Sequence, residues 1–81
     1  MQMEELQFDT EYITLGQLLK MVNAISSGGM AKWFLSENIV YVKGEGEQRR
    51  GRKLYDGDIV MVPGAGKFKL AAAPDGNRDV Y

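Results

Sequence analysis

Four of the five residues from Arg49 to Lys53 (RRGRK) are cationic, although the chain of 81 residues carries 10 basic and 11 acidic side chains. The run is rich in arginine, whose planar guanidinium can donate two parallel hydrogen bonds to a phosphate or a carboxylate. Gly51 lies inside the run, where the missing side chain lets the backbone come close to a ligand. Such a run is often only a solvated surface, but its density in a chain of net charge −1 favours a site for phosphate groups.

The stretch Ser26-Ser27-Gly28-Gly29 separates two apolar patterns of helical spacing. Its simplest interpretation is a turn between two helices, with Ser27 as the N-cap of the second helix. The free N–H groups at a helix start also attract anions, and Lys32 follows one turn later. These residues are therefore a second candidate for phosphate contact.

Residue types that usually perform catalysis or hold metals are missing. The chain has no histidine and no cysteine, so the usual general base, thiolate ligands and disulfides are excluded. Gly44–Gly46 lacks the third glycine of a dinucleotide fingerprint, and Gly64–Lys67 lacks the Ser or Thr of a phosphate loop. Asp56–Asp58 has no further ligands at calcium-loop spacing and is typical of a turn. We therefore expect no catalytic residue, no metal site and no cofactor.

Apolar spacing predicts the elements that position the two candidate stretches. A helix is predicted over Leu15–Ile25, where Thr14 and Gln17 form a capping box at its start. A second helix is predicted over Met30–Glu37, with Asn38 as its stop. Strands are predicted at Gln7–Ile13, Ile39–Val42, Ile59–Val62 and Lys67–Leu70, with loops at Gly44–Glu47 and along the basic run, and a loose tail at residues 71–81.

Four aromatic residues lie near these stretches. Trp33 and Phe34 could stack on nucleobases or belong to the core; the core is favoured for Phe34 and both remain open for Trp33. Tyr41 and Tyr55 lie on or beside the predicted strands, where burial of the ring is the default.

Charge is unevenly distributed along the chain. Met1–Ile13 contains four acids and no base, whereas Lys43–Lys53 contains five bases and two acids, a net charge of +3. No apolar run approaches the roughly 20 residues that cross a bilayer, and the acidic start does not match a signal peptide. We therefore expect a cytoplasmic protein that makes no membrane contact.

The order of parts is informative: the hairpin sequence SGGMAKWFLSE, a strand ending in a glycine turn, a basic loop and a Gly-Asp turn into another strand. From Ile13 to Gly64 this order resembles the S4-like RNA-binding domain, also called the alpha-L motif, and especially the small stand-alone bacterial proteins of the YaaA type. The resemblance implies an α+β fold in which a two-helix hairpin packs on a small, mainly antiparallel, curved β-sheet. It implies a single domain over residues 1–70.

The resemblance also implies an RNA-binding face, formed by the first turn of the second helix and the loop after the first strand. Carried over by position, the RNA-binding residues are Ser27, Gly28, Gly29, Lys32, Lys43, Arg49, Arg50, Arg52 and Lys53.

Two functions of different classes follow as hypotheses. The first is a non-catalytic RNA-binding module for structured RNA of the ribosomal or transfer type, with the ribosome as a candidate partner. The second is a protein-interaction adaptor whose basic loop docks an acidic partner, including the segment Glu4–Glu11 of another copy. A monomer is expected, with weak self-association left open.

Overall fold

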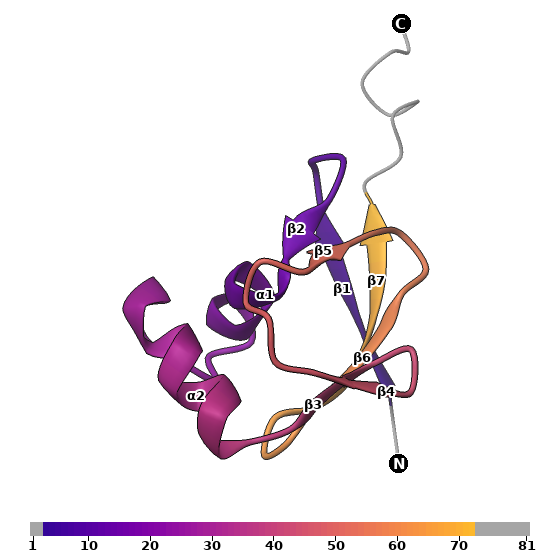
Figure 1. Ribbon diagram of the computed structural model, residues 1–81. Helices are drawn as coiled ribbons and strands as arrows, with labels where there is room; N and C mark the ends of the chain where they lie inside the picture. Colours follow the sequence, from indigo (N-terminus) through magenta and orange to yellow (C-terminus); the bar gives the residue numbers. More distant parts are fainter. Residues whose placement is uncertain (1–2, 73–81) are drawn as a thin grey trace, which may run out of the picture.

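The computed structural model describes residues 3–72 and has two layers, a five-stranded sheet and two short helices on one side of it (Figure 1). The strand order is β1-β7-β6-β3-β4, and β2 and β5 form a separate two-stranded sheet. All pairings are antiparallel except that of β1 with β7. The prediction of a small α+β fold with a mainly antiparallel sheet is therefore confirmed.

The elements follow in a simple order along the chain. They are β1 (Met3–Phe8), β2 (Ile13–Thr14), α1 (Leu15–Met21), the 3₁₀ turn η1 (Gly28–Met30), α2 (Ala31–Glu37), β3 (Val40–Val42), β4 (Glu45–Glu47), β5 (Lys53–Leu54), β6 (Ile59–Val62) and β7 (Gly66–Ala72).

One apolar core joins the helices to the inner face of the sheet. Strands alternate as expected for a half-buried sheet, so Val60 and Val62 of β6 are buried while Ile59 and Met61 face outward. The helices contribute three fully buried leucines from α1, and Phe34 and Leu35 from α2.

Helix α1 begins as predicted but ends early. Thr14 and Gln17 form the capping box, with the Gln17 N–H donating to Thr14 Oγ1 at 3.2 Å and the Thr14 N–H donating to Gln17 Oε1 at 2.9 Å. The predicted end at Ile25 is wrong, because Asn23 takes a left-handed conformation with φ 62°. The N–H groups of Asn23 and Ala24 donate to the carbonyls of Lys20 and Leu19, a Schellman ending. The last apolar residues of the pattern therefore belong to the connection and not to the helix.

Helix α2 agrees closely with its prediction. Its first turn is the 3₁₀ turn η1, and Asn38 ends it, with Nδ2 donating to the Phe34 carbonyl at 3.1 Å. Ser27 occupies the N-cap position of η1, but its side chain makes no capping hydrogen bond. The prediction that Ser27 caps the helix with its side chain is therefore corrected.

One strand prediction, one loop prediction and the predicted tail also need correction. The strand expected over Gln7–Ile13 is β1, which starts at Met3 and ends at Phe8, while Ile13 begins β2. The stretch Gly44–Glu47, expected as a loop, supplies β4, which pairs with β3. Lys43 at φ 55° and Gly44 at φ 83° form the tight turn between them, a conformation that antiparallel hairpins favour. Residues 71 and 72, expected in the loose tail, belong to β7, and the rest of the expected tail, residues 73–81, lies outside the described part.

Candidate nucleic-acid interface

The basic loop (Arg49–Lys53) is tied to the start of α1 by main-chain hydrogen bonds. The N–H groups of Leu15 and Gly16 donate to the carbonyl oxygens of Arg52 and Arg50, each at 2.9 Å. The first N–H groups of a helix have no partner inside it, so the loop supplies their acceptors. The main chains approach closely here, since a Cβ added at Gly16 would lie in van der Waals contact with the Arg50 carbonyl oxygen, at 3.4 Å. The loop therefore has a fixed place beside α1.

Glu47, the last residue of β4, anchors two of the loop arginines. Its carboxylate accepts hydrogen bonds from the Arg49 main-chain nitrogen at 3.0 Å, from Arg49 Nε at 2.9 Å and from Arg52 Nη1 at 2.6 Å. Glu47 is only 7% exposed, so its carboxylate is largely shielded from water. The Arg52 side chain keeps 27% of its surface exposed and the Arg49 side chain 75%. Arg52 thus holds the loop in place, while Arg49 remains open to a ligand.

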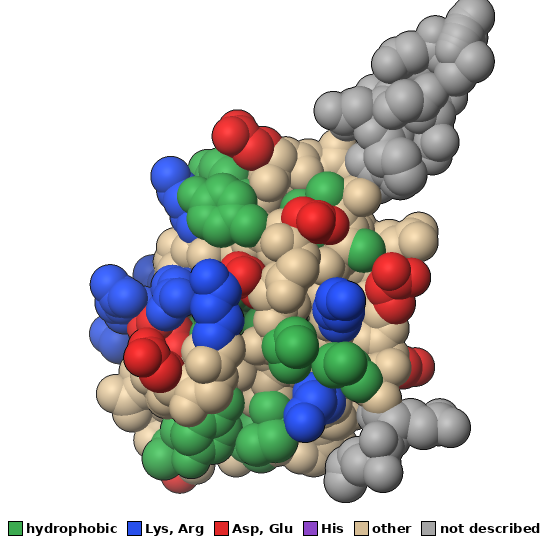
Figure 2. Space-filling model, turned by 90° about the vertical axis from the view of Figure 1, so that its right-hand side faces the viewer, with side chains coloured by type: hydrophobic (Ala, Val, Ile, Leu, Met, Phe, Trp, Pro, Cys, Tyr) green, Lys and Arg blue, Asp and Glu red, His purple; other side chains and the backbone are tan. Residues whose placement is uncertain are grey.

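The same network shifts the protonation equilibria of its members. The pKa of Glu47 is lowered from 4.5 to about 2, chiefly because Arg49 donates hydrogen bonds to the charged carboxylate, with burial acting in the opposite direction. The carboxylate in turn raises the pKa of Arg49 above its ordinary value. At neutral pH one negative charge therefore faces two positive charges, and the basic loop keeps a positive balance. Figure 2 shows Lys and Arg side chains gathered toward one edge of the molecule, with acidic side chains among them.

An open groove of about 380 Å³ lies where the basic loop meets the helices. We call it the loop–helix groove; it is lined by Thr14, Gly16, Gln17, Lys20, Gly28, Ala31, Arg50 and Gly51. Arg50 and Gly51 of the basic loop form one wall, Gly28 of the Ser/Gly turn (Ser26–Gly29) and Ala31 of α2 form the other, and residues 14–20 supply the rest of the lining. The two stretches that the sequence singled out separately therefore border one concavity.

Lys20 is a residue of this groove that the sequence analysis did not select. It lies in the last turn of α1, is exposed, and lines the groove together with Arg50. The available signal was its position three residues after Gln17, on the polar side of α1. This position suggests a role for Lys20 only once the basic loop is known to pack against the same helix.

The Ser/Gly turn presents bare main chain to solvent. The Met30 N–H donates to the Ser27 carbonyl at 3.1 Å, whereas no hydrogen bond within the described residues uses the N–H groups of Gly28 and Gly29. A Cβ added at either glycine would meet nothing within 4 Å. Neither glycine is therefore required by the packing of this chain.

Lys32, Lys43 and Lys53 occupy three different settings. Lys32 is exposed on α2 just beyond the Ser/Gly turn. Lys53 holds its Nζ 4.8 Å from the centre of the Tyr12 ring. Lys43 does not line the groove, because it lies in the turn before β4 whereas the basic loop follows β4, a strand about 10 Å long. The Lys43 Nζ forms an ion pair with Asp58 at 3.2 Å.

The aromatic residues divide between the core and the surface. Phe34 is 8% exposed, as the sequence favoured, whereas Trp33 is 57% exposed on the same helix. Tyr55 is 46% exposed and its ring centre lies 5.9 Å from that of Tyr12. Tyr12 and Tyr55 therefore form an aromatic surface next to the basic loop. Tyr12 was not predicted as part of this surface, because it is distant from the loop in the sequence.

The acidic turn Asp56–Asp58 is structural, as expected. Asp58 accepts a hydrogen bond from the Tyr55 N–H at 2.9 Å, and Asp56 accepts one from the Ala72 N–H at 2.9 Å. Across residues 3–72 no group of three or more acidic, His or Cys side chains is placed to hold a metal ion. In the same residues no helix is long and apolar enough to span a membrane.

Comparison with known proteins gives two matches. A family model described as the S4 domain matches residues 6–70. The chain is 58% identical over 65 residues to the "Probable ribosome maturation protein RlbA" of Bacillus subtilis (strain 168), an alignment that covers 80% of this chain and 92% of that protein. The family match includes both the basic loop and the Ser/Gly turn.

Proposed function

This chain belongs to the S4 domain family, and from that premise we propose that it is a non-catalytic module that binds structured RNA in the loop–helix groove. The observation that carries the proposal is that residues of both candidate phosphate-binding stretches line one concavity. The basic loop supplies guanidinium groups, and the Ser/Gly turn supplies unobstructed main-chain N–H groups. Backbone contacts of this kind recognise the shape and phosphate spacing of folded RNA without reading base sequence.

The proposed RNA-binding residues have different tasks. Arg50, Lys32 and Lys20 contact phosphates directly, because they are exposed and the described residues provide no ion pair for them. Arg49 contributes its exposed face, and Arg52 positions the loop through Glu47.

The remaining proposed contacts lie around these. Ser27, Gly28 and Gly29 offer the second wall, Lys53 lies over the Tyr12 ring, and Lys43 contacts RNA at the margin of the surface. The two tyrosines offer faces on which an unpaired base can stack.

The relative's printed name suggests the class of RNA. We propose that the partner is ribosomal RNA or a ribosomal particle during its maturation, which would place the protein in the cytoplasm. No catalytic role is proposed, because the residues that line the groove include no His, Asp, Glu or Cys. The module acts as a monomer in this proposal.

An acidic protein partner is a less suitable ligand for the same loop. Glu47 already occupies the paired-carboxylate position on Arg49 and Arg52, so an incoming carboxylate would have to compete with it inside the network. Phosphates can instead use the remaining exposed cations along the groove.

The proposal is tested by fluorescence anisotropy with a labelled stem-loop of ribosomal RNA over a salt series. We expect the variant Lys20→Ala/Arg50→Ala to bind about tenfold more weakly, because two phosphate contacts are lost. The slope of log affinity against log salt should fall by roughly 1.4 to 1.8, at about 0.7 to 0.9 for each contact. Arg49 and Arg52 are left unchanged so that the Glu47 network survives.

The control is Lys67→Ala/Lys69→Ala, which removes the same charge from the outward face of β7. Its affinity should stay close to that of the natural chain. Equal losses in the two variants would show that general charge, and not the groove, attracts RNA, and would contradict the proposal.

A further inference from the structure

The loop–helix groove continues past the start of α1 into a second concavity. This open hollow of about 620 Å³ is lined by Thr10, Glu11, Tyr12, Thr14 and Gln17, and we call it the Tyr12 hollow. Thr14 and Gln17 also line the loop–helix groove, so the two concavities meet at the capping box of α1. A strand of RNA that leaves the groove on this side therefore reaches Tyr12.

Two tyrosines lie at the end of this path, held by the pairing of β2 with β5. Ile13 and Leu54 oppose each other in that pair and are buried, which fixes the neighbouring residues Tyr12 and Tyr55. The ring centres are 5.9 Å apart and the ring planes are tilted by 54°. Tyr12 is partly buried, whereas Tyr55 is 46% exposed and its N–H donates to Asp58 at 2.9 Å. Tyr12 therefore supports Tyr55, which presents ring surface to a ligand.

The charges beside the tyrosines separate a phosphate from a base. Lys53, the last cation of the basic loop, places its Nζ 4.8 Å from the centre of the Tyr12 ring. Glu11 lines the Tyr12 hollow, and no ion pair within residues 3–72 joins it to a cation. Its charge disfavours a phosphate inside the hollow. The backbone of a bound strand is thus favoured beside the basic loop and Lys53, with an uncharged base toward the tyrosines.

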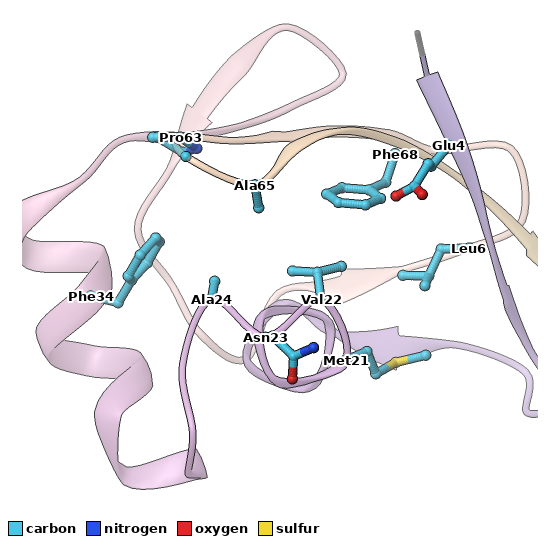
Figure 3. A pocket seen from close by; sticks show the side chains of 11 residues that line it. Glu4, Leu6, Met21, Val22, Asn23, Ala24, Phe34, Pro63, Ala65 and Phe68 are labelled. Atoms are coloured by element: carbon cyan, nitrogen blue, oxygen red, sulfur yellow. The ribbon is translucent and has the colours of Figure 1, made fainter.

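A cavity with two phenylalanines at the other end of α1 is less suited to a base (Figure 3). It has a volume of about 550 Å³ and shares no lining residue with the loop–helix groove. Its Phe34 and Phe68 belong to the core, at 8% and 5% exposed, and Glu4 lies beside Phe68. No Lys or Arg lines it. The Tyr12–Tyr55 pair, in contrast, is continuous with the proposed phosphate site.

A base that is paired inside a helix cannot use this pair of rings. The faces of such a base are covered by its neighbours in the stack, and the deep, narrow major groove of an RNA helix excludes side chains. An unpaired nucleotide exposes its ring faces, and aromatic side chains stack on it. The lining of the Tyr12 hollow is mostly polar, which also argues against an apolar protein side chain as the occupant.

We propose that the RNA bound by this chain carries an unpaired nucleotide beside the stem in the loop–helix groove, and that its base stacks on Tyr55. This RNA class rests on the function proposed above and narrows it, from folded RNA in general to a junction between paired and unpaired nucleotides. Tyr12 is a positioning residue that holds Tyr55. Lys53 supplies a cation beside the rings for the phosphate of that nucleotide.

Three labelled RNAs test this selectivity by anisotropy with the full chain. They are a blunt duplex, the same duplex with an unpaired adenosine at a strand end, and the same duplex with an abasic nucleotide at that position. The added nucleotide is placed in turn at the 5′ and the 3′ end. We expect the adenosine at one of these ends to raise the affinity about tenfold over the blunt duplex. The abasic nucleotide adds the same phosphate without a base, and it should give only a small part of this gain.

Variants of the exposed aromatic residues locate the base. The difference between the adenosine and abasic RNAs should disappear in Tyr55→Leu, which removes the ring, and persist in Tyr55→Phe, which keeps it. Trp33→Leu is the matched control, because Trp33 is 57% exposed on α2 and lines neither the groove nor the Tyr12 hollow. The difference should stay about tenfold in that variant.

Equal affinity for the adenosine and abasic RNAs in the natural chain would overturn the proposed selectivity. A difference that survives in Tyr55→Leu, or that is lost in Trp33→Leu instead, would overturn the assignment to Tyr55. In each of these cases the groove itself still stands if Lys20→Ala/Arg50→Ala weakens binding of the blunt duplex. Binding of the blunt duplex that is insensitive to that variant would contradict the proposed function, and the junction selectivity with it.

Discussion

The two walls of the loop–helix groove are built in different ways. The basic loop is held by a buried carboxylate and by two hydrogen bonds to the start of α1, so its side chains have a defined position. The Ser/Gly turn has no side-chain cap, and its glycines touch nothing that would resist a Cβ. One wall is therefore fixed in advance, and the other offers accessible main chain with little internal restraint.

This difference indicates a division of labour in binding. A preorganised cluster of cations loses little conformational entropy when it meets phosphates, and it sets where the ligand lies. The bare turn adds contacts only if the ligand approaches closely enough to reach main-chain N–H groups. Substitutions that break the Glu47 network should thus act through the structure of the basic loop, and those in the Ser/Gly turn should act through access to its main chain.

The largest effect is expected at Glu47. Glu47→Gln removes the charge that binds Arg49 and Arg52, and it leaves the partly buried Arg52 with a weaker acceptor, at a cost of about 1–3 kcal/mol in stability. RNA affinity should fall although the net charge rises by one, because the loop loses its fixed position. Thermal unfolding and RNA anisotropy measure the two effects. Glu45→Gln in the same strand is exposed, and it should leave stability unchanged and affinity unchanged or slightly higher.

The pH dependence of the free energy of unfolding is a second test of the Glu47→Gln variant. The pKa of Glu47 lies near 2 in the folded protein and 4.5 is its ordinary value. Its stabilising contribution is therefore complete above pH 4.5 and disappears as the pH falls toward 2. The stability difference between the natural chain and Glu47→Gln should shrink through that window. A difference that stayed constant would show that the ion-pair network does not stabilise the folded loop.

A smaller effect is expected at the other wall. Gly28→Ala/Gly29→Ala should preserve or slightly raise the melting temperature, because both positions have open space and neither has a positive φ. RNA affinity should fall by about threefold, since two methyl groups would separate phosphates from the turn. Unchanged affinity would remove the Ser/Gly turn from the RNA surface.

Gly51→Ala extends this comparison to the basic loop. An added Cβ at Gly51 also meets nothing within 4 Å, so the fold should tolerate it. A loss of affinity similar to that of the turn variant would mean that RNA approaches the main chain of both walls.

Much of this arrangement could be predicted from local sequence. The capping box at Thr14 and Gln17, the stop at Asn38 and the alternating strand Ile59–Val62 depend on neighbouring residues, and all three are confirmed. The early end of α1 also has a local cause, the left-handed conformation of Asn23. The spacing of apolar residues could not predict it, because that spacing continues beyond Asn23.

The internal organisation of the basic loop could not be predicted in this way. The sequence placed four similar cations in a row, and only the fold shows that Arg52 is tied to a buried Glu47 while Arg50 is exposed. Lys20 and Tyr12 join the surface through packing between segments that are distant in the chain. The same limit applies to β4, whose glycine-rich, acidic sequence becomes a strand because β3 lies beside it.

The most direct test of the central claim is to map the RNA footprint on the full chain by amide NMR. We predict that a stem-loop of ribosomal RNA shifts resonances on both walls at once, at Arg50 and Gly51 and at Gly28 and Gly29, together with Lys20. Resonances of the β1 edge should remain unchanged in the same titration. A footprint centred on β1, or on the outward face of the sheet around Tyr41 and Met61, would contradict the assignment of the loop–helix groove as the RNA-binding surface.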